Sequence, residues 1–169
     1  MKSYFDIFDT KNDYDDSKKD LYVSNVSVCM DTDEVYYSKQ LPLTYKASQQ
    51  ITVDESNFSS TINYGTYDEE TEEGSIVFDK NLIEIGDEAF ADMTEIESIT
   101  IPETVESIGE NAFNGCSGLT EVVMNPTTPP EIGEGAFDNT NDCDIIVPLE
   151  SKEAYKESWS EYAEQITTE

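Results

Sequence analysis

The side chains that could carry chemistry in this chain are almost all carboxylates. Its 169 residues include 38 Asp and Glu and nine Lys, but no Arg or His. Without His there is no imidazole general base, no His-containing triad and no His-ligated metal site. Two carboxylates can hydrolyse a glycoside, but only when they face each other across a cleft, and no spacing here predicts such a pair. We therefore expect no enzyme, no catalytic residue and no cofactor.

Two further groups of reactive side chains also have simpler explanations. Asp9, Asp13, Asp15 and Asp16 could form a calcium loop, but the run lacks that loop's Gly and distal Glu. A solvated acidic segment is the favoured interpretation, and no metal site is predicted. The chain contains three Cys, an odd number, and their positions suggest that they pack as small apolar side chains. We therefore expect no disulfide framework.

The net charge of −29 is spread unevenly along the chain. Residues 47–169 contain 29 acids and only three Lys. Such a surface would repel nucleic acid and anionic lipid headgroups. It is either a solvated, aggregation-resistant surface or an acidic face for a basic partner or divalent cations. The first residues show no apolar region of a signal peptide, so we expect either a mature sequence or a protein not exported in that way. No stretch reaches membrane-spanning length, and no membrane insertion is predicted.

The elements that position these side chains are predicted by an internal repeat. An Ile-Gly pair, an Ala-Phe pair and a third residue recur at a spacing of about 23 residues, the second step being longer than the first by one. A fixed period in this range is typical of repeats that stack, each burying its apolar face against its neighbours. The recurring residues are Ile85-Gly86, Ala89-Phe90 and Met93; Ile108-Gly109, Ala112-Phe113 and Cys116; and Ile132-Gly133, Ala136-Phe137 and Thr140.

Each repeat also contains two apolar residues separated by one residue, which is the pattern of a strand. The pairs recur with the same period and predict strands near 75–78, 98–101, 121–124 and 144–147, stacked as a parallel ladder. Pro102 would end its strand, Gly109 would supply a backbone conformation that a Cβ opposes, and Phe113 would fill the interior. After the last repeat, an apolar stripe at helical spacing predicts a helix over 149–166: Ala154, Tyr155, Trp159, Tyr162, Ala163 and Ile166.

Residues 96–119 resemble the unit of the BspA-like leucine-rich repeat family, which runs strand, Pro, Val, Ile-Gly, Ala-Phe, Cys, Leu. The matching residues are Ile99, Ile101, Pro102, Val105, Ile108-Gly109, Ala112-Phe113, Cys116 and Leu119. The end of the chain is similar to the family's usual ending, at Thr128-Pro129-Pro130, Val147-Pro148, Glu153-Ala154-Tyr155-Lys156, Trp159 and Tyr162.

This resemblance implies an α/β repeat fold: a right-handed leucine-rich-repeat solenoid with short parallel strands. We expect an acidic N-terminal arm and strand segment at 1–32, a β-rich lead-in at 33–73, about three repeats at 74–148 and a helical cap at 149–169. Apolar alternation in the first segments predicts strands around Leu21 to Val28 and Glu34 to Ser38. The resemblance further implies a non-enzymatic adhesion module on a cell surface or outside the cell, which binds a protein or glycan. It leaves open a phage virion or fibre component.

Binding would then use the residues between the buried ones of each strand. These candidates are Ser75, Val77, Ser98, Thr100, Glu121, Val123, Asp144 and Ile146. They are also ordinary strand residues, and that interpretation stays open. A second candidate is the apolar start of the chain, at Tyr4, Phe5, Ile7 and Phe8, which either packs on the chain itself or anchors it to an assembly. The oligomeric state is not predicted.

Overall fold

A computed structural model of the chain describes residues 26–29, 36–39 and 41–168. The chain divides into two compact units, residues 1–40 and residues 41–169. In the first unit, β1 (Val26–Cys29) pairs antiparallel with β2 (Tyr36–Lys39). Strands were expected in both places; Leu21 and Val23 lie outside the described residues. Among the described residues, no helix is long and apolar enough to cross a bilayer.

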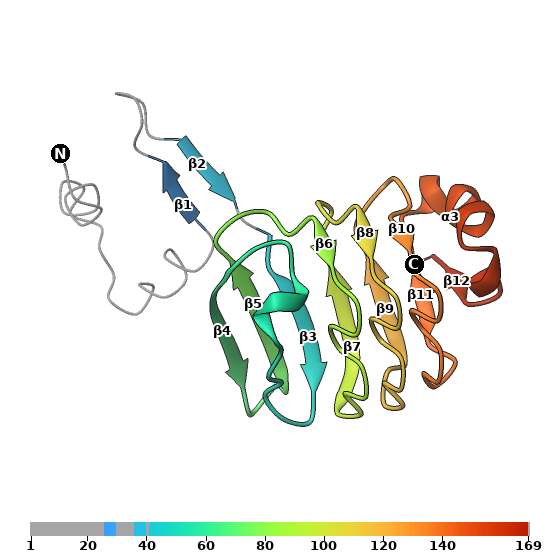
Figure 1. Cartoon of the computed structure of the whole chain (residues 1–169), viewed down its shortest axis with the longest axis horizontal. Helices are drawn as coiled ribbons and strands as arrows, with labels where there is room; N and C mark the ends of the chain where they lie inside the picture. The colour runs from blue at the N-terminus through green and yellow to red at the C-terminus, as the bar shows by residue number, and fades with distance from the viewer. Residues whose placement is uncertain (1–25, 30–35, 40, 169) are drawn as a thin grey trace. The chain divides into compact units, whose positions relative to one another are not determined.

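The second unit contains two sheets, and successive repeats add one strand to each of them (Figure 1). The smaller one is parallel and has the order β10-β8-β6, with bounds β6 Glu84–Ile85, β8 Ser107–Ile108 and β10 Glu131–Ile132. The larger one has the order β12-β11-β9-β7-β3-β5-β4, with bounds β3 Leu43–Ala47, β4 Ile62–Asp68, β5 Glu73–Phe78, β7 Ile96–Ile101, β9 Glu121–Met124, β11 Asp144–Ile146 and β12 Ile166–Thr167.

Three of the four predicted repeat strands form the expected parallel ladder. Ile99 of β7 lies opposite Val122 of β9, which lies opposite Ile145 of β11, so each step across the sheet is one full repeat along the chain. The first step of the prediction is wrong, because β3 lies between β5 and β7 and is antiparallel to both. β5 instead forms an antiparallel pair with β4, which precedes it directly in the chain, and such local pairs need no crossover connection.

The β6-β8-β10 sheet brings equivalent Ile-Gly pairs together. Ile85 and Ile108 are buried and in register. Gly109 was expected to supply a backbone conformation that a Cβ opposes, but its φ is not positive. A Cβ there is opposed by close approach instead, since it would lie 2.5 Å from the amide nitrogen of Asp87. Among the glycines of the described residues, positive φ occurs at Gly115 and Gly135.

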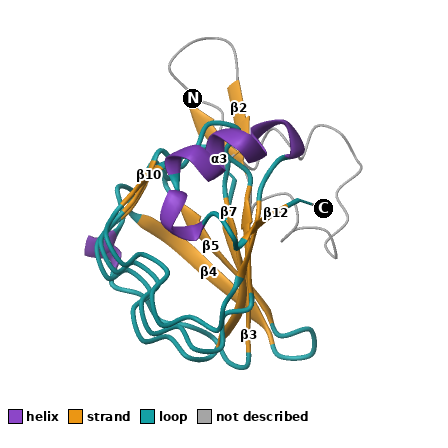
Figure 2. Cartoon of the chain, turned by 90° about the vertical axis from the view of Figure 1, so that its right-hand side faces the viewer, coloured by secondary structure: helices purple, strands orange, loops and turns teal. Residues whose placement is uncertain are grey.

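Aromatic rings from successive repeats stack on one another in the core. Phe90 and Phe113 have ring centroids 5.0 Å apart, and Phe113 and Phe137 have centroids 5.1 Å apart, with nearly parallel planes. All three are buried, as are Cys116 and Leu119. The predicted inward positions are therefore correct. In the view along the strand order, the loops of successive repeats superpose on the side away from β7 and β12, and β10 lies above these loops (Figure 2).

The last segment is only partly helical. It contains a turn of 3-10 helix, η3 (Leu149–Ser151), the short helix α3 (Lys152–Ser158), a second 3-10 turn, η4 (Ser160–Tyr162), and then β12, which pairs parallel with β11. The predicted helix over 149–166 is therefore too long, because its last residues add a strand to the sheet. Ala154 is exposed and Ala163 half-buried, so they are not full members of the stripe.

The aromatic residues of this segment pack against the final repeat. Trp159 is buried against Phe137, with ring centroids 6.0 Å apart, and its Nε1 donates to the carbonyl of Pro130 at 2.9 Å. The Tyr155 hydroxyl donates to the carbonyl of Pro126 at 2.8 Å. These bonds pair buried carbonyls that no strand serves, which favours a structural role for Trp159.

Candidate functional site

The outward side of the seven-stranded sheet carries most of the residues that the sequence proposed. Ile99 and Ile101 point inward and are fully buried, so Ser98 and Thr100 beside them point outward and are half-buried. Seven of the eight candidates are exposed or half-buried in this way: Ser75, Ser98, Thr100, Glu121, Val123, Asp144 and Ile146.

Val77 does not fit the expected pattern. Only 2% of its surface is exposed, so it is not available as a binding residue. Its partner in the antiparallel β4-β5 pair is Tyr64, and directly opposed residues of such a pair project to the same face. The expected parallel ladder did not include this antiparallel neighbour, so the repeat pattern gave no indication of the pairing.

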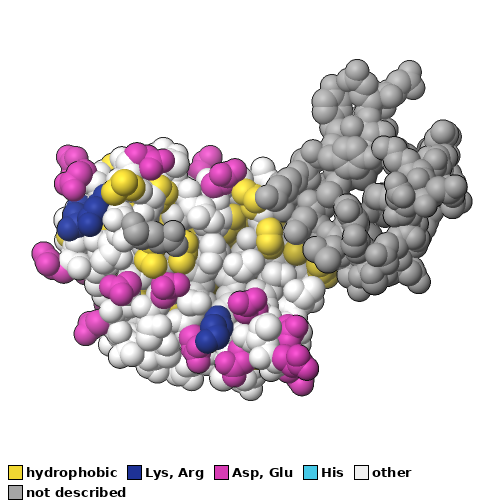
Figure 3. Space-filling model, turned by 180° about the vertical axis from the view of Figure 1, so that it is seen from behind, with side chains coloured by type: hydrophobic (Ala, Val, Ile, Leu, Met, Phe, Trp, Pro, Cys, Tyr) yellow, Lys and Arg dark blue, Asp and Glu magenta, His cyan; other side chains and the backbone are white. Residues whose placement is uncertain are grey.

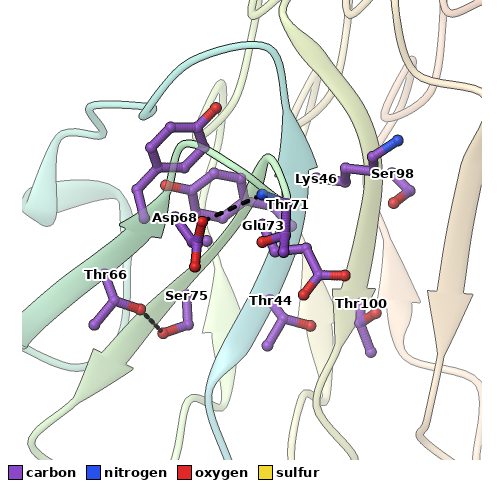
Figure 4. A pocket seen from close by; sticks show the side chains of 12 residues that line it. Thr44, Lys46, Thr66, Asp68, Thr71, Glu73, Ser75, Ser98 and Thr100 are labelled. Atoms are coloured by element: carbon purple, nitrogen blue, oxygen red, sulfur yellow. Dashed lines mark hydrogen bonds between the residues drawn. The ribbon is translucent and has the colours of Figure 1, made fainter. Parts of the chain in front are cut away.

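Four hydroxyl side chains form a row across four strands. Register places Thr66 of β4 opposite Ser75 of β5, Ser75 opposite Thr44 of β3, and Thr44 opposite Thr100 of β7. The Thr66 and Ser75 hydroxyl oxygens are 2.8 Å apart and hydrogen-bonded. We call these four residues the hydroxyl row (Figure 4). It continues in register into the half-buried Val123 and Ile146.

Half of the hydroxyl row was missed by the sequence analysis. Thr44 and Thr66 belong to strands outside the repeat period, so no repeat alignment could place them beside Ser75 and Thr100. A local signal was present: Leu43, Tyr45 and Ala47 alternate with polar residues and are all buried. That alternation predicts a strand with an outward Thr44, but not its position between β5 and β7.

A second outward row, parallel to the first, is charged. In register across the sheet it contains Asp68, Glu73, Lys46, Ser98, Glu121 and Asp144, which we call the acidic row. Lys46 is the only lysine in the seven strands of this sheet. It pairs with Glu97, whose Oε2 lies 3.0 Å from its Nζ, next to an irregularity in the β3-β7 register. The hydrogen bond to Glu97 raises the pKa of the Lys46 ammonium group.

The two rows border a hollow of about 630 Å³. Its lining spans β4, β5, β3 and β7 and includes the ring of Tyr45, which occupies the space that a Cβ on Gly74 would fill. The ring of Tyr67 stacks on Tyr45 with centroids 6.4 Å apart, and its hydroxyl donates to the carbonyl of Ala47 at 2.8 Å. Burial raises the pKa of Tyr45. The hollow is thus held by aromatic side chains and bordered by polar ones.

The polar groups of the hollow are suited to binding. Asp68 is occupied locally, since its Oδ1 accepts from the backbone amides of Glu70 and Thr71. The hydroxyls and Glu73 remain at the surface, where they can accept or donate hydrogen bonds to a ligand. No group of three or more acidic or Cys side chains within the described residues has metal-binding geometry.

A second hollow, of about 370 Å³, lies by the C-terminal segment. It is lined by Phe137, Tyr162 and several carboxylates, including Asp138, Asp142 and Glu161. Phe137 and Tyr162 are engaged in the core, where the Tyr162 hydroxyl accepts from the Phe137 amide at 3.3 Å. This hollow contains none of the predicted binding residues.

Two further candidates from the sequence lie outside the residues that the structure describes. They are the apolar start of the chain, at Tyr4, Phe5, Ile7 and Phe8, and the acidic run from Asp9 to Asp16.

Comparison with known proteins adds one finding. The family model described as "BspA type Leucine rich repeat region" matches residues 44–164 in six copies. The matched range begins within β3 and extends through η4, so it includes every residue of the hydroxyl row. The search of curated proteins gives no match.

Proposed function

Because this chain belongs to the BspA-type leucine-rich repeat family, whose repeats commonly mediate protein interactions, we propose that it is a non-enzymatic binding module that uses the outward face of its seven-stranded sheet. The observation that carries this proposal is the hydroxyl row. Thr66, Ser75, Thr44 and Thr100 come from four strands and border one hollow. Side chains from distant parts of the sequence meet there on a rigid support.

The proposal includes the finer architecture. We infer a right-handed solenoid of the repeats at 74–148, preceded by segments 1–32 and 33–73 and closed by a cap at 149–169. In support, backbone bonds join each turn to the next in a third ladder: the amides of Phe90 and Phe113 donate to the carbonyls of Ala112 and Ala136, each at 2.8 Å. Trp159 and Tyr162 pack on Phe137, as a cap over the last repeat would.

The proposed setting is a cell surface or the extracellular space, where the module adheres to a protein or glycan of a host or an assembly. Family membership supports this setting. The negative charge of the chain disfavours nucleic acid and anionic membranes as partners, since its 38 acidic residues outnumber its nine lysines.

The test is binding of the labelled full chain to a printed array of glycans and extracellular-matrix proteins. Thr100→Tyr places a bulky ring in the hollow, while Thr128→Tyr makes the same change at an exposed position in a connecting loop. We expect Thr100→Tyr to weaken binding about tenfold or more and Thr128→Tyr to change it less than about twofold. Equal effects of the two variants, or product release from any glycan, would contradict the proposal.

A second candidate is a virion or fibre component anchored through its N-terminal arm, in segment 1–32. The division of the chain at residue 40 favours this candidate, because a separate unit can serve as an anchor. Solution mass is the test. Assembly by the full chain, and not by a chain that begins at Leu41, would support anchoring; a monomeric full chain would exclude a built-in assembly role.

A further inference from the structure

The acidic row places like charges side by side on the outward face. Asp68 lies opposite Glu73 in the β4-β5 pair, and Glu121 lies opposite Asp144 in the β9-β11 pair. Like charges in such positions destabilise a sheet. The single lysine of these strands, Lys46, pairs with Glu97 and interacts more weakly with Glu73, which lies opposite it, so no lysine of these strands lies opposite Asp68, Glu121 or Asp144. The face therefore retains two pairs of adjacent carboxylates that repel each other across the sheet.

The rest of the surface offers these carboxylates little compensation. Beyond Lys46, residues 41–168 contain only Lys80, Lys152 and Lys156, and none of them lies in a strand of this sheet. In the space-filling view from behind, acidic side chains far outnumber lysines (Figure 3). The outward face therefore has more carboxylates than lysines to balance them, and a positively charged ligand would complement it.

The dimensions of the face also limit the partner. From β4 to β11 the acidic row crosses five inter-strand steps, or roughly 24 Å at about 4.8 Å each. An extended peptide of about seven residues has this length. The parallel hydroxyl row can satisfy polar groups of such a segment, and Val123 and Ile146 offer it apolar contact.

We propose that the outward face binds an extended segment of a partner protein, and this proposal rests on the proposed binding function. The segment lies across the strands and carries lysine or arginine side chains. Its cations face the acidic row, and its polar groups lie over the hydroxyl row. A neutral glycan would desolvate Glu73 and Glu121 without neutralising them, and an anionic ligand would be repelled. Protein is therefore the favoured class of partner over glycan.

The test uses two blocked, labelled octapeptides, (Lys-Ser)4 and (Glu-Ser)4, in a fluorescence polarisation titration of the full chain. The variant Glu73→Gln/Glu121→Gln removes two carboxylates of the acidic row. Its control, Glu84→Gln/Glu131→Gln, removes two exposed carboxylates from the other sheet and gives the same net charge. Both variants are first checked for native melting.

We expect (Lys-Ser)4 to bind and (Glu-Ser)4 not to bind. The acidic-row variant should weaken binding of the lysine peptide about fivefold or more, the control less than about twofold, and salt should weaken binding throughout. Equal weakening by both variants would show attraction to the net charge alone and overturn the proposal, as would binding that neither variant affects. If Thr100→Tyr abolishes binding to an array target while Glu73→Gln/Glu121→Gln does not, the binding function stands and the basic partner is wrong.

Discussion

The rings of Phe90 and Phe113, which occupy the same position in successive repeats, stack with centroids 5.0 Å apart and planes only 5° from parallel. Phe113 stacks in the same way on Phe137, so it is the middle ring of three. Equivalent residues of successive repeats thus contact each other directly. This contact holds the repeats in the register that aligns the strands of the sheet.

Truncation of the middle ring should therefore be costly. Phe113→Ala removes a fully buried ring and both stacks, and we expect the free energy of unfolding to fall by about 3–5 kcal/mol. Urea titration of the full chain measures this. Leu149→Ala is the control, since Leu149 is 74% exposed and should cost less than about 0.5 kcal/mol. A similar small loss in both variants would show that the stack does not support the fold.

One position of the repeat has a positive φ in three successive repeats, and the stability of the chain should depend on which residue occupies it. Glu88, Asn111 and Gly135 occupy equivalent places in three repeats, and all have positive φ, of 55°, 53° and 67°. Gly135→Ala should lower the free energy of unfolding by about 1–2 kcal/mol, because L side chains resist this conformation. Glu88→Gly should leave it unchanged or raise it by up to about 1 kcal/mol. Thermal melting would contradict this account if both variants were destabilised alike.

The two buried thiols should be inert. Burial raises the pKa of Cys116 to about 12, and its Sγ donates to the carbonyl of Phe90 at 3.0 Å. Burial also raises the pKa of Cys143. In a Cys29→Ser background, iodoacetamide at neutral pH should label neither thiol of the native chain and both after unfolding, as mass spectrometry would show. Rapid labelling of the native protein would mean that the core opens readily.

Tyr155 should couple stability to alkaline pH. Burial raises its pKa above the ordinary 10.0, so its contribution to stability is complete below pH 10 and declines as the pH rises above that value. Tyr155→Phe leaves the carbonyl of Pro126 without this donor and should cost about 1–3 kcal/mol at pH 7. Melting curves at rising pH should then fall less steeply for the variant than for the parent. Parallel curves would mean that Tyr155 ionises in the folded chain as freely as in the unfolded one.

Lys46 should oppose basic ligands. It is the one cation in the strands of the sheet and is paired with Glu97. Lys46→Met removes this pair, and because the pair is exposed, its loss should barely change the melting temperature. Affinity for (Lys-Ser)4 should rise about two- to fivefold, because repulsion is removed and the Glu97 carboxylate is released. Weaker peptide binding by this variant would show that Lys46 itself contacts the ligand.

The repeat strands could be predicted from sequence because each buries a pair of apolar residues at a fixed distance along the chain. Ile99, Val122 and Ile145 occur once per repeat, and they are neighbours in the sheet. The inward Phe113 and Cys116 follow from the same repeat. Periodicity is informative here because each repeat packs on an equivalent one.

The remaining features depend on contacts outside the repeat. Nothing in Leu43 to Ala47 specifies that β3 lies between β5 and β7, since its alternation would suit many sheets. The same insertion places Thr44 in the hydroxyl row, and the β4 pairing puts Tyr64 beside Val77. Ile166 was assigned to a helix because its spacing fits one, although it pairs with β11 as part of a strand. Half of the hydroxyl row was therefore beyond a repeat-based prediction.

The central claim is that ligands bind the outward face of the seven-stranded sheet. An amide NMR titration of the full chain with (Lys-Ser)4 tests it most directly, because each backbone amide reports its own surroundings. We predict that the largest shifts occur in β3, β5, β7 and β9, around Thr44, Ser75, Thr100 and Glu121, with little change in β6, β8 and β10. Shifts centred on β6, β8 and β10, or spread evenly over the acidic surface, would contradict the claim.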